Sequence, residues 1–257
     1  MLFNLVAGGA AFLLGVLLLY FSAVQRARVQ RYQELRRWSA RELAEQPPPD
    51  GTALEIGGRI VCDSPATAAQ SRQACVFFLS QVRERVEETT VQVNRRTGRP
   101  DREVRTFHRN LEEFTDRVPF QIDDGTGRVG IDPFQAAIEG KRVVDRFQVA
   151  PPAAPPLPVP AGEAGAPPPA GSLRLLGTRH DEVILAPGQT VTVFGTLARR
   201  DGQPWIQKGP LPSGLFLITP RTRDEVTAEA AKAMRFWLVA GGASCLLGLA
   251  AFLLGFW

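Results

Sequence analysis

The sequence carries an uncharged stretch at each end: residues 2–24 read LFNLVAGGAAFLLGVLLLYFSAV, and residues 236–257 read FWLVAGGASCLLGLAAFLLGFW. An α-helix rises about 1.5 Å per residue and the hydrocarbon core of a bilayer is roughly 30 Å thick, so about 20 apolar residues can cross it. The 257-residue sequence therefore predicts two transmembrane helices, and the polar residues between them suffice for one sizeable soluble domain.

Two other interpretations of the terminal stretches are a cleaved signal peptide and a buried core helix. A signal peptide has basic residues before its apolar region, whereas only Met1 precedes the first stretch and arginines follow it. Tyr20, Phe21, Phe236 and Trp237 lie near the predicted boundaries, where amphipathic rings favour the headgroup layer. These features favour membrane anchors.

Basic residues gather on the inner side of both stretches. The expected membrane-surface basic residues are Arg26, Arg28, Arg31, Arg36, Arg37 and Arg41. Because Lys and Arg near a span tend to stay in the cytoplasm, we expect a cytoplasmic domain, and the Ala, Arg, Gly and Pro bias suggests a bacterial inner membrane. The net charge of +4 is compatible with anionic membrane lipid as a partner. We expect no nucleic-acid partner, because the sequence contains no basic and aromatic module of a known nucleic-acid-binding type.

Small residues recur every fourth position in both stretches. The two stripes are Ala7, Ala11 and Gly15 in the first, and Ala240, Ser244 and Gly248 in the second. Such stripes let helix backbones approach closely, although Gly and Ala are also generally enriched in spanning helices. The sharper hypothesis is that the stripes face each other or a second copy, which would make a homo-oligomer.

The segment between the spans predicts an α+β architecture with a mainly β domain over 52–220. Residues 25–46 have a helical apolar period and are expected to continue the first helix as a basic juxtamembrane helix, which the prolines at 47–49 end. Turn residues at 123–127 and 200–202 indicate hairpins. The expected strands are 54–61, 74–86, 118–122, 128–131, 143–149, 190–198, 204–207 and 215–218.

Residues 150–171 are nearly all Pro, Ala and Gly, with Glu163 as the one acid. This composition buries too little side chain to offset the cost of ordering, so an exposed loop with polyproline character is expected. A docking site for a proline-binding module is the alternative, because the prolines are suitably spaced.

Few residues could carry chemistry. Cys245 lies in the second span, which leaves Cys75 or Cys62 with His108 or His180 as a possible nucleophile and base. The stretch ACVFF around Cys75 is typical of a strand with a buried thiol. We expect no metal site, because zinc needs four paired Cys or His ligands, and no cofactor, because no phosphate or dinucleotide motif occurs. The two thiols would be free in the cytoplasm and could pair outside it.

A binding face is the other candidate site. By residue type, the best candidates are His108, Arg109, Asp123, Asp124 and Trp205. The two adjacent aspartates do not make a calcium loop, which needs many oxygen ligands at set intervals.

The order of motifs between the two spans resembles a known domain. The motifs are LEIGGRIVCDSP at 54–65, QSRQACVFF at 70–78, HRNLEEFTDRVPFQIDDGTGRVGIDP at 108–133, TVTVFGTLARRDGQPWIQ at 190–207 and LFLIT at 215–219. Together they resemble the GIDE, or "beside a membrane" (BAM), domain of a mitochondrial membrane-anchored E3 ubiquitin ligase. In that ligase a zinc-binding RING after the second helix recruits the conjugating enzyme. No RING ligands occur up to Trp257, so the resemblance implies a stand-alone, prokaryote-like member without ligase activity.

The resemblance also bears on sidedness, because the ligase domain lies in the intermembrane space, which corresponds to the outside of a bacterium. The arginines of this sequence indicate the inside, and we follow them. We expect a membrane-anchored, non-catalytic scaffold or sensor with an unknown protein partner. The alternative is a membrane-anchored hydrolase or transferase that uses a cysteine. A transporter is disfavoured because neither span holds an ionisable side chain.

Overall fold

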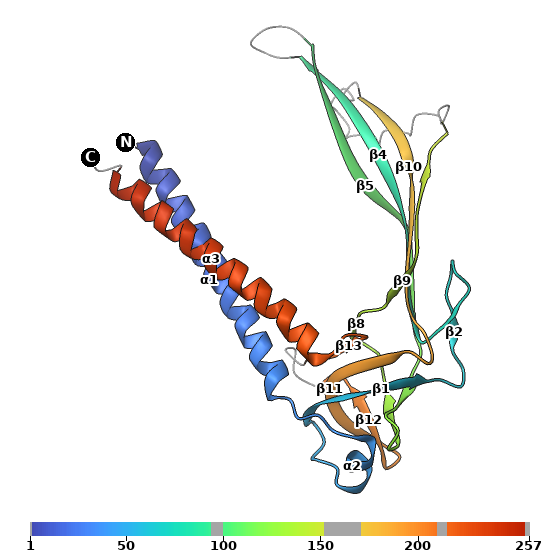
Figure 1. The fold of residues 1–257 in the computed structure, drawn as a ribbon. Helices are drawn as coiled ribbons and strands as arrows, with labels where there is room; N and C mark the ends of the chain where they lie inside the picture. The colour runs from blue at the N-terminus through green and yellow to red at the C-terminus, as the bar shows by residue number, and fades with distance from the viewer. Residues whose placement is uncertain (1, 94–99, 152–170, 210–214, 255–257) are drawn as a thin grey trace.

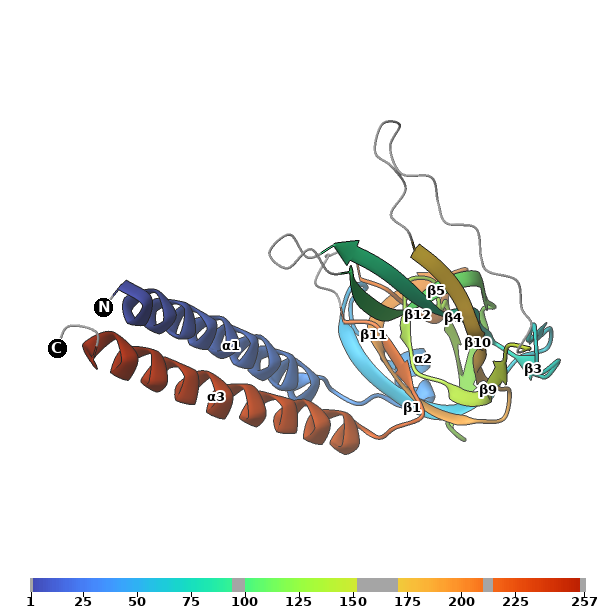
Figure 2. The same ribbon diagram turned by 90° about the horizontal axis from the view of Figure 1, so that it is seen from above.

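The chain folds into a helical hairpin, a β-rich base and a β-sheet arm. The computed structural model describes residues 2–93, 100–151, 171–209 and 215–254. The hairpin consists of α1 (Leu2–Glu34) and α3 (Arg223–Leu254), which run antiparallel so that both termini lie at its far end (Figures 1 and 2). Residues Ala7–Glu34 and Arg223–Leu253 are long and apolar enough to cross a membrane. The predicted fold class, a mainly β domain flanked by two long apolar helices, is confirmed.

Glycines set the distance between the two helices of the hairpin. A Cβ added to Gly8 would lie 2.9 Å from the Gly248 carbonyl oxygen, and one added to Gly15 would lie 2.9 Å from the Gly241 carbonyl oxygen. These pairs are seven residues apart on each helix, which is the repeat that keeps one seam of a helix against its partner. The helices therefore pack backbone against backbone, as small residues allow in membrane hairpins.

The helix predicted over 25–46 is interrupted. α1 ends at Glu34, and a separate short helix, α2 (Ala40–Glu45), follows. Ser39 caps α2 through a reciprocal capping box, in which its hydroxyl accepts from the Glu42 N–H and the Glu42 carboxylate accepts from the Ser39 N–H. This local signal outweighs the continuous apolar period that predicted one helix.

The base is a small curled sheet. Its strands, in spatial order, are β1 (Ala53–Val61), β6 (Phe120–Asp123), β7 (Arg128–Ile131), β12 (Gln203–Gln207), β11 (Thr190–Arg200), β13 (Leu217–Thr219) and β8 (Ala137–Ile138). β1 also pairs with β11, so the sheet closes on itself around an apolar core. The expected strands in this part of the chain correspond to these elements, and the turn at 200–202 places Asp201 and Gly202 at positive φ between β11 and β12.

The arm is a second, four-stranded sheet. Its order is β5 (Pro100–Arg117), β4 (Phe77–Val93), β10 (Gly171–Leu185) and β9 (Lys141–Val149), and the short hairpin of β2 (Ala66–Thr67) and β3 (Ala74–Cys75) packs at its lower end. Figure 1 shows the arm and the helical hairpin leaving the base toward the same side. β5 and β10 were not predicted as strands, and neither were the two-residue strands β2 and β8; β5 is rich in charge, and β10 carries the polar run RHDE in its second half. The Pro-rich loop predicted over 150–171 lies outside the described residues except at 150, 151 and 171.

Candidate functional site

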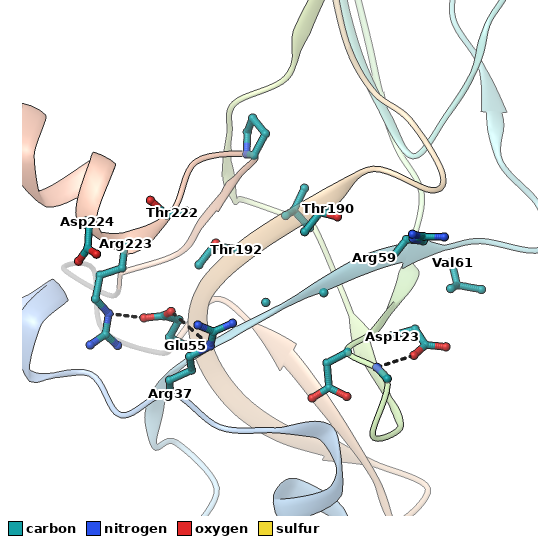
Figure 3. A pocket seen from close by; sticks show the side chains of 16 residues that line it. Arg37, Glu55, Arg59, Val61, Asp123, Thr190, Thr192, Thr222, Arg223 and Asp224 are labelled. Carbon is teal, nitrogen blue, oxygen red and sulfur yellow. Dashed lines mark hydrogen bonds and ion pairs between the residues drawn. The ribbon is translucent and has the colours of Figure 1, made fainter.

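A large cavity lies where the hairpin joins the base. This junction pocket has a volume of about 920 Å³ and is lined by the linker before α2, the middle of β1, the β6–β7 turn, the start of β11 and the start of α3 (Figure 3). Its lining is mostly backbone, threonine, arginine and carboxylate. None of the described residues that line it is a cysteine or a histidine, so the pocket does not hold the cysteine and histidine pair that the sequence offered as nucleophile and base.

A buried carboxylate ties the hairpin to the base at this pocket. Glu55 on β1 is only 3% exposed. It forms an ion pair with Arg223, the first residue of α3, and a looser one with Arg37 of the linker, whose Nε lies 4.0 Å from the Glu55 Oε1. Arg223 also donates to the backbone carbonyl of Leu35, at the end of α1. Glu55 thus links the start of α3 and the linker that follows α1 to the sheet (Figure 3).

The sheet edge inside the pocket is left open over one residue. The Trp38 N–H donates to the Glu55 carbonyl (2.9 Å), and the Glu55 N–H donates to the Arg36 carbonyl (3.1 Å), so the linker covers β1 at Glu55. β6 covers the same edge only from Arg59 onward. Since backbone groups alternate along a strand, Gly57 presents its N–H and C=O to this edge between the two covers.

The two adjacent aspartates of the β6–β7 turn are largely occupied by the chain itself. Asp124 accepts from the N–H of Ala40, the first residue of α2, at 2.8 Å, and from Thr126 and Gly127 in the turn. Burial raises the pKa of the Asp124 carboxyl, but these hydrogen bonds outweigh it, so the net pKa is lowered. Asp123 accepts from Gly125 at 2.9 Å. Both carboxylates therefore stabilise the turn, and Asp124 also holds the start of α2.

The family comparison matches the part of the chain that includes most of the arm, most of the base and α3. The family model named GIDE, described as "E3 Ubiquitin ligase", matches residues 88–254, about two thirds of the sequence. The chain belongs to the GIDE family. Searches of the curated proteins and of the solved structures returned no match.

The five residues considered for a binding face of this GIDE chain lie on different elements. His108 and Arg109 lie midway along β5 in the arm, where Arg109 bonds Glu84 of β4. Trp205 lies on β12, with the Arg200 guanidinium 4.9 Å from its ring centroid. The structure thus brings only the two aspartates to the junction pocket. His108 and Arg109 do not join them because they lie in the arm, which is a separate sheet, and Trp205 lies on a base strand that does not line the pocket.

The cysteines of this GIDE chain differ in environment, and all three are free. Cys75 is fully buried, and burial, with the nearby carboxylates of Glu182 and Asp116, raises the pKa of its thiol to about 11. A nucleophilic cysteine needs the opposite shift. Cys62 is partly exposed, and its thiol lies 3.9 Å from the Pro119 carbonyl oxygen. Nothing in this geometry supports catalysis by either cysteine.

The two histidines offered as bases both lie in the arm. His180 stands opposite Val82, and His108 stands opposite Arg85. In the described part of the chain no group of three or more His, Cys, Asp or Glu residues could hold a metal ion.

The arginines after the first span have three different settings. Arg26, Arg28 and Arg31 lie on the last turns of α1. Arg36 stacks on Trp38 at 4.0 Å and pairs with Glu42, and Arg37 lies in the junction pocket. Arg41 lies in α2, where its N–H donates to Thr126.

The small-residue stripes lie partly on the contact between the helices. The Ser244 hydroxyl donates to the Ala11 carbonyl at 2.8 Å, and Gly15 and Gly248 are both buried in the contact. Ala7 is exposed and Ala240 is half-buried. The helices meet through glycines spaced seven residues apart, and of these the predicted four-residue stripes contain only Gly15 and Gly248.

The residues that organise the junction pocket are not evident from the sequence alone. Glu55 is the one acid in the apolar strand ALEIGGRIV, and Arg223 stands at the start of α3. An isolated acid in a buried strand signals a paired charge, because an unpaired one is costly to bury. Its partner could not be found from sequence, since it lies 168 positions away.

Proposed function

We propose that this chain is a membrane-anchored, non-catalytic interaction module of the GIDE family, whose junction pocket receives an extended segment of a partner protein. The observation that carries the proposal is the open edge of β1 at Gly57, inside a cavity of about 920 Å³. An extended segment can bond to exposed strand groups there, as in other strand-addition complexes.

Carboxylates and arginines both line the pocket, and Arg59 is the arginine that favours a partner segment with an acidic residue. Arg59 is exposed and lines the pocket, while Arg37 and Arg223 are directed to Glu55. Thr190 and Thr192 add hydroxyl groups from β11. The proposed partner is therefore a protein segment with a carboxylate near Arg59.

The proposal places the base and arm in the cytoplasm of a bacterial cell, on the strength of the arginines that follow the first span. The arm carries charged residues along β4 and β5, so a bilayer that holds the hairpin has to leave the arm in water. A single cysteine at Gln148, on the exposed part of β9, reports the side. A membrane-impermeant maleimide should fail to label it in intact cells; labelling before the membrane is opened would contradict the cytoplasmic placement.

Site-specific photocrosslinking tests the pocket. A photoreactive amino acid at Thr192, which lines the pocket, should give one defined crosslinked product in cells, and Arg59→Glu should reduce it at least several-fold. The same probe at Gln148, away from the pocket, is the matched control. Equal products at the two positions, or a Thr192 product unaffected by Arg59→Glu, would contradict a partner site in the pocket.

A separate assay tests the non-catalytic part of the proposal. The family is described as an E3 ubiquitin ligase, and that activity is not assigned here to any residue of the chain. The purified chain with ubiquitin, activating enzyme, conjugating enzyme and ATP should leave the rate of ubiquitin-chain formation unchanged. A rate that rises with the concentration of the chain would overturn the proposal.

A further inference from the structure

A second cavity lies at the foot of the hairpin, on the side of α1 that faces β13. This foot groove has a volume of about 540 Å³ and lies between residues 24–32 of α1 and the base. Arg28 and Arg31 enter it from α1, and Lys208 enters it from the end of β12. Among the described residues that line it there is no carboxylate, so the lining carries three cations and no acid.

The nearby acidic side chains are engaged by other groups. Glu139, whose charge acts on Arg28, accepts hydrogen bonds from Thr219 (2.5 Å) and from Arg221. No ion pair of Arg31 or Lys208 is found within the described part of the chain. The groove therefore keeps its positive charge in the folded protein.

The depth of the groove matches the headgroup layer of a bilayer. Val24 closes the uncharged stretch of α1 and lines the groove, and Arg28 follows one helical turn later, about 6 Å along the axis. The polar layer of a bilayer leaflet extends roughly 5–7 Å beyond the hydrocarbon. Arg28 is thus at headgroup level when residues 2–24 span the membrane.

The apolar lining completes the fit to a lipid. Val24 and Ala27 line the membrane end of the groove, and Phe216 and Leu217 line its inner wall. An acyl chain can lie against the first two residues while its phosphate reaches the cations, which is how basic pockets beside spanning helices hold lipid headgroups.

We propose that the foot groove is a binding site for one anionic glycerophospholipid, held by Arg28, Arg31 and Lys208. This site is separate from the junction pocket and does not depend on the function proposed for it. The occupant is a lipid of the surrounding leaflet, because the groove opens at the level where the hydrocarbon ends. A soluble phosphate would gain nothing from Val24 and Ala27.

Native mass spectrometry of the full chain, released from nanodiscs of phosphatidylcholine with a minor share of phosphatidylglycerol, tests the site. One phosphatidylglycerol should remain bound in preference to phosphatidylcholine. The double variant Arg28→Gln/Lys208→Gln should lower the bound fraction roughly tenfold or more, because each juxtamembrane cation contributes to anionic lipid affinity. The control Arg26→Gln/Arg235→Gln removes the same charge next to the same spans without altering the groove lining.

The outcomes separate the possible sources of binding. Equal loss in the two double variants would overturn the proposal, because the effect would be surface charge rather than a site. Displacement of phosphatidylglycerol by millimolar glycerol 3-phosphate would also overturn it, since the groove would then bind free phosphate. Circular dichroism should show the same folded spectrum for both variants; loss of preference in a folded groove variant alone supports the site.

Discussion

Replacing the buried carboxylate of Glu55 should destabilise the base more than replacing Arg37, its exposed partner. The Glu55 side chain is 4% exposed, the Arg223 side chain 26% and the Arg37 side chain 71%. Removing one member of a buried ion pair costs about 3–5 kcal/mol. In Glu55→Gln, Arg223 would still contact solvent and donate to the Leu35 carbonyl. We therefore expect Glu55→Gln to lower the free energy of unfolding by about 2–3 kcal/mol.

The assay is thermal unfolding in detergent, followed by tryptophan fluorescence. For a domain of this size 1 kcal/mol corresponds to a shift of about 2–4 °C in Tm, so Glu55→Gln should lower Tm by roughly 4–12 °C. Arg37→Gln is the matched control and should cost less than about 0.5 kcal/mol, because its pair is exposed and long. Glu55→Gln and Arg223→Gln should not be additive. A Glu55→Gln shift no larger than that of Arg37→Gln, or full additivity, would refute the reasoning.

Three further predictions concern the hairpin, the thiols and pH. Gly241→Leu should reduce disulfide crosslinking between engineered cysteines on facing positions of α1 and α3, because a Cβ at Gly241 would lie 3.0 Å from the backbone of α1. The control Gly242→Leu should leave the crosslinking unchanged, since nothing lies within 4 Å of a Cβ at Gly242. In a variant without the membrane cysteine, Cys62 should react with an aromatic disulfide reagent in the folded protein, while Cys75 should react only after unfolding; fast reaction of Cys75 would contradict its buried, raised-pKa state. Burial raises the pKa of Glu139, but hydrogen bonds from its partners outweigh burial, so the net pKa is lowered. The lowered pKa contributes stability that is present above the unfolded pKa near 4.5 and is lost as the pH falls through the folded pKa. Glu139→Gln should therefore flatten the fall in Tm between neutral pH and about pH 3, and an unchanged slope would contradict this.

The hairpin was readable from sequence, but its contact seam was not. Uncharged stretches of sufficient length predict spanning helices because the bilayer sets the length. The four-residue spacing of Ala and Ser was visible, whereas the seam runs at seven-residue intervals through Gly8, Gly15, Gly241 and Gly248. Each helix carries small residues on more than one face, and only the antiparallel pairing of the two helices determines which of these residues form the contact.

Strand prediction found every base strand except the two-residue β8, but in the arm it found only β9 and the first part of β4 and missed β5 and β10. Base strands such as ALEIGGRIV are buried on one face and therefore carry alternating apolar residues. β5 is the opposite case: nine residues of PDREVRTFHRNLEEFTDR are charged, and its pairing to β4 over its whole length makes it a strand. Cross-strand ion pairs such as Arg109 with Glu84 replace the apolar pattern.

The sequence by itself determined two helices long and apolar enough to span a membrane, a mainly β domain between them, and the GIDE resemblance, because span length, strand periodicity and motif order are local properties of the chain. Only the tertiary structure decided where the sites lie. The junction pocket joins Glu55 to Arg223 across 168 positions, and the foot groove joins Arg28 to Lys208 from opposite ends of the chain. Both sites depend on how the antiparallel hairpin closes onto the curled sheet, and no local pattern specifies that contact.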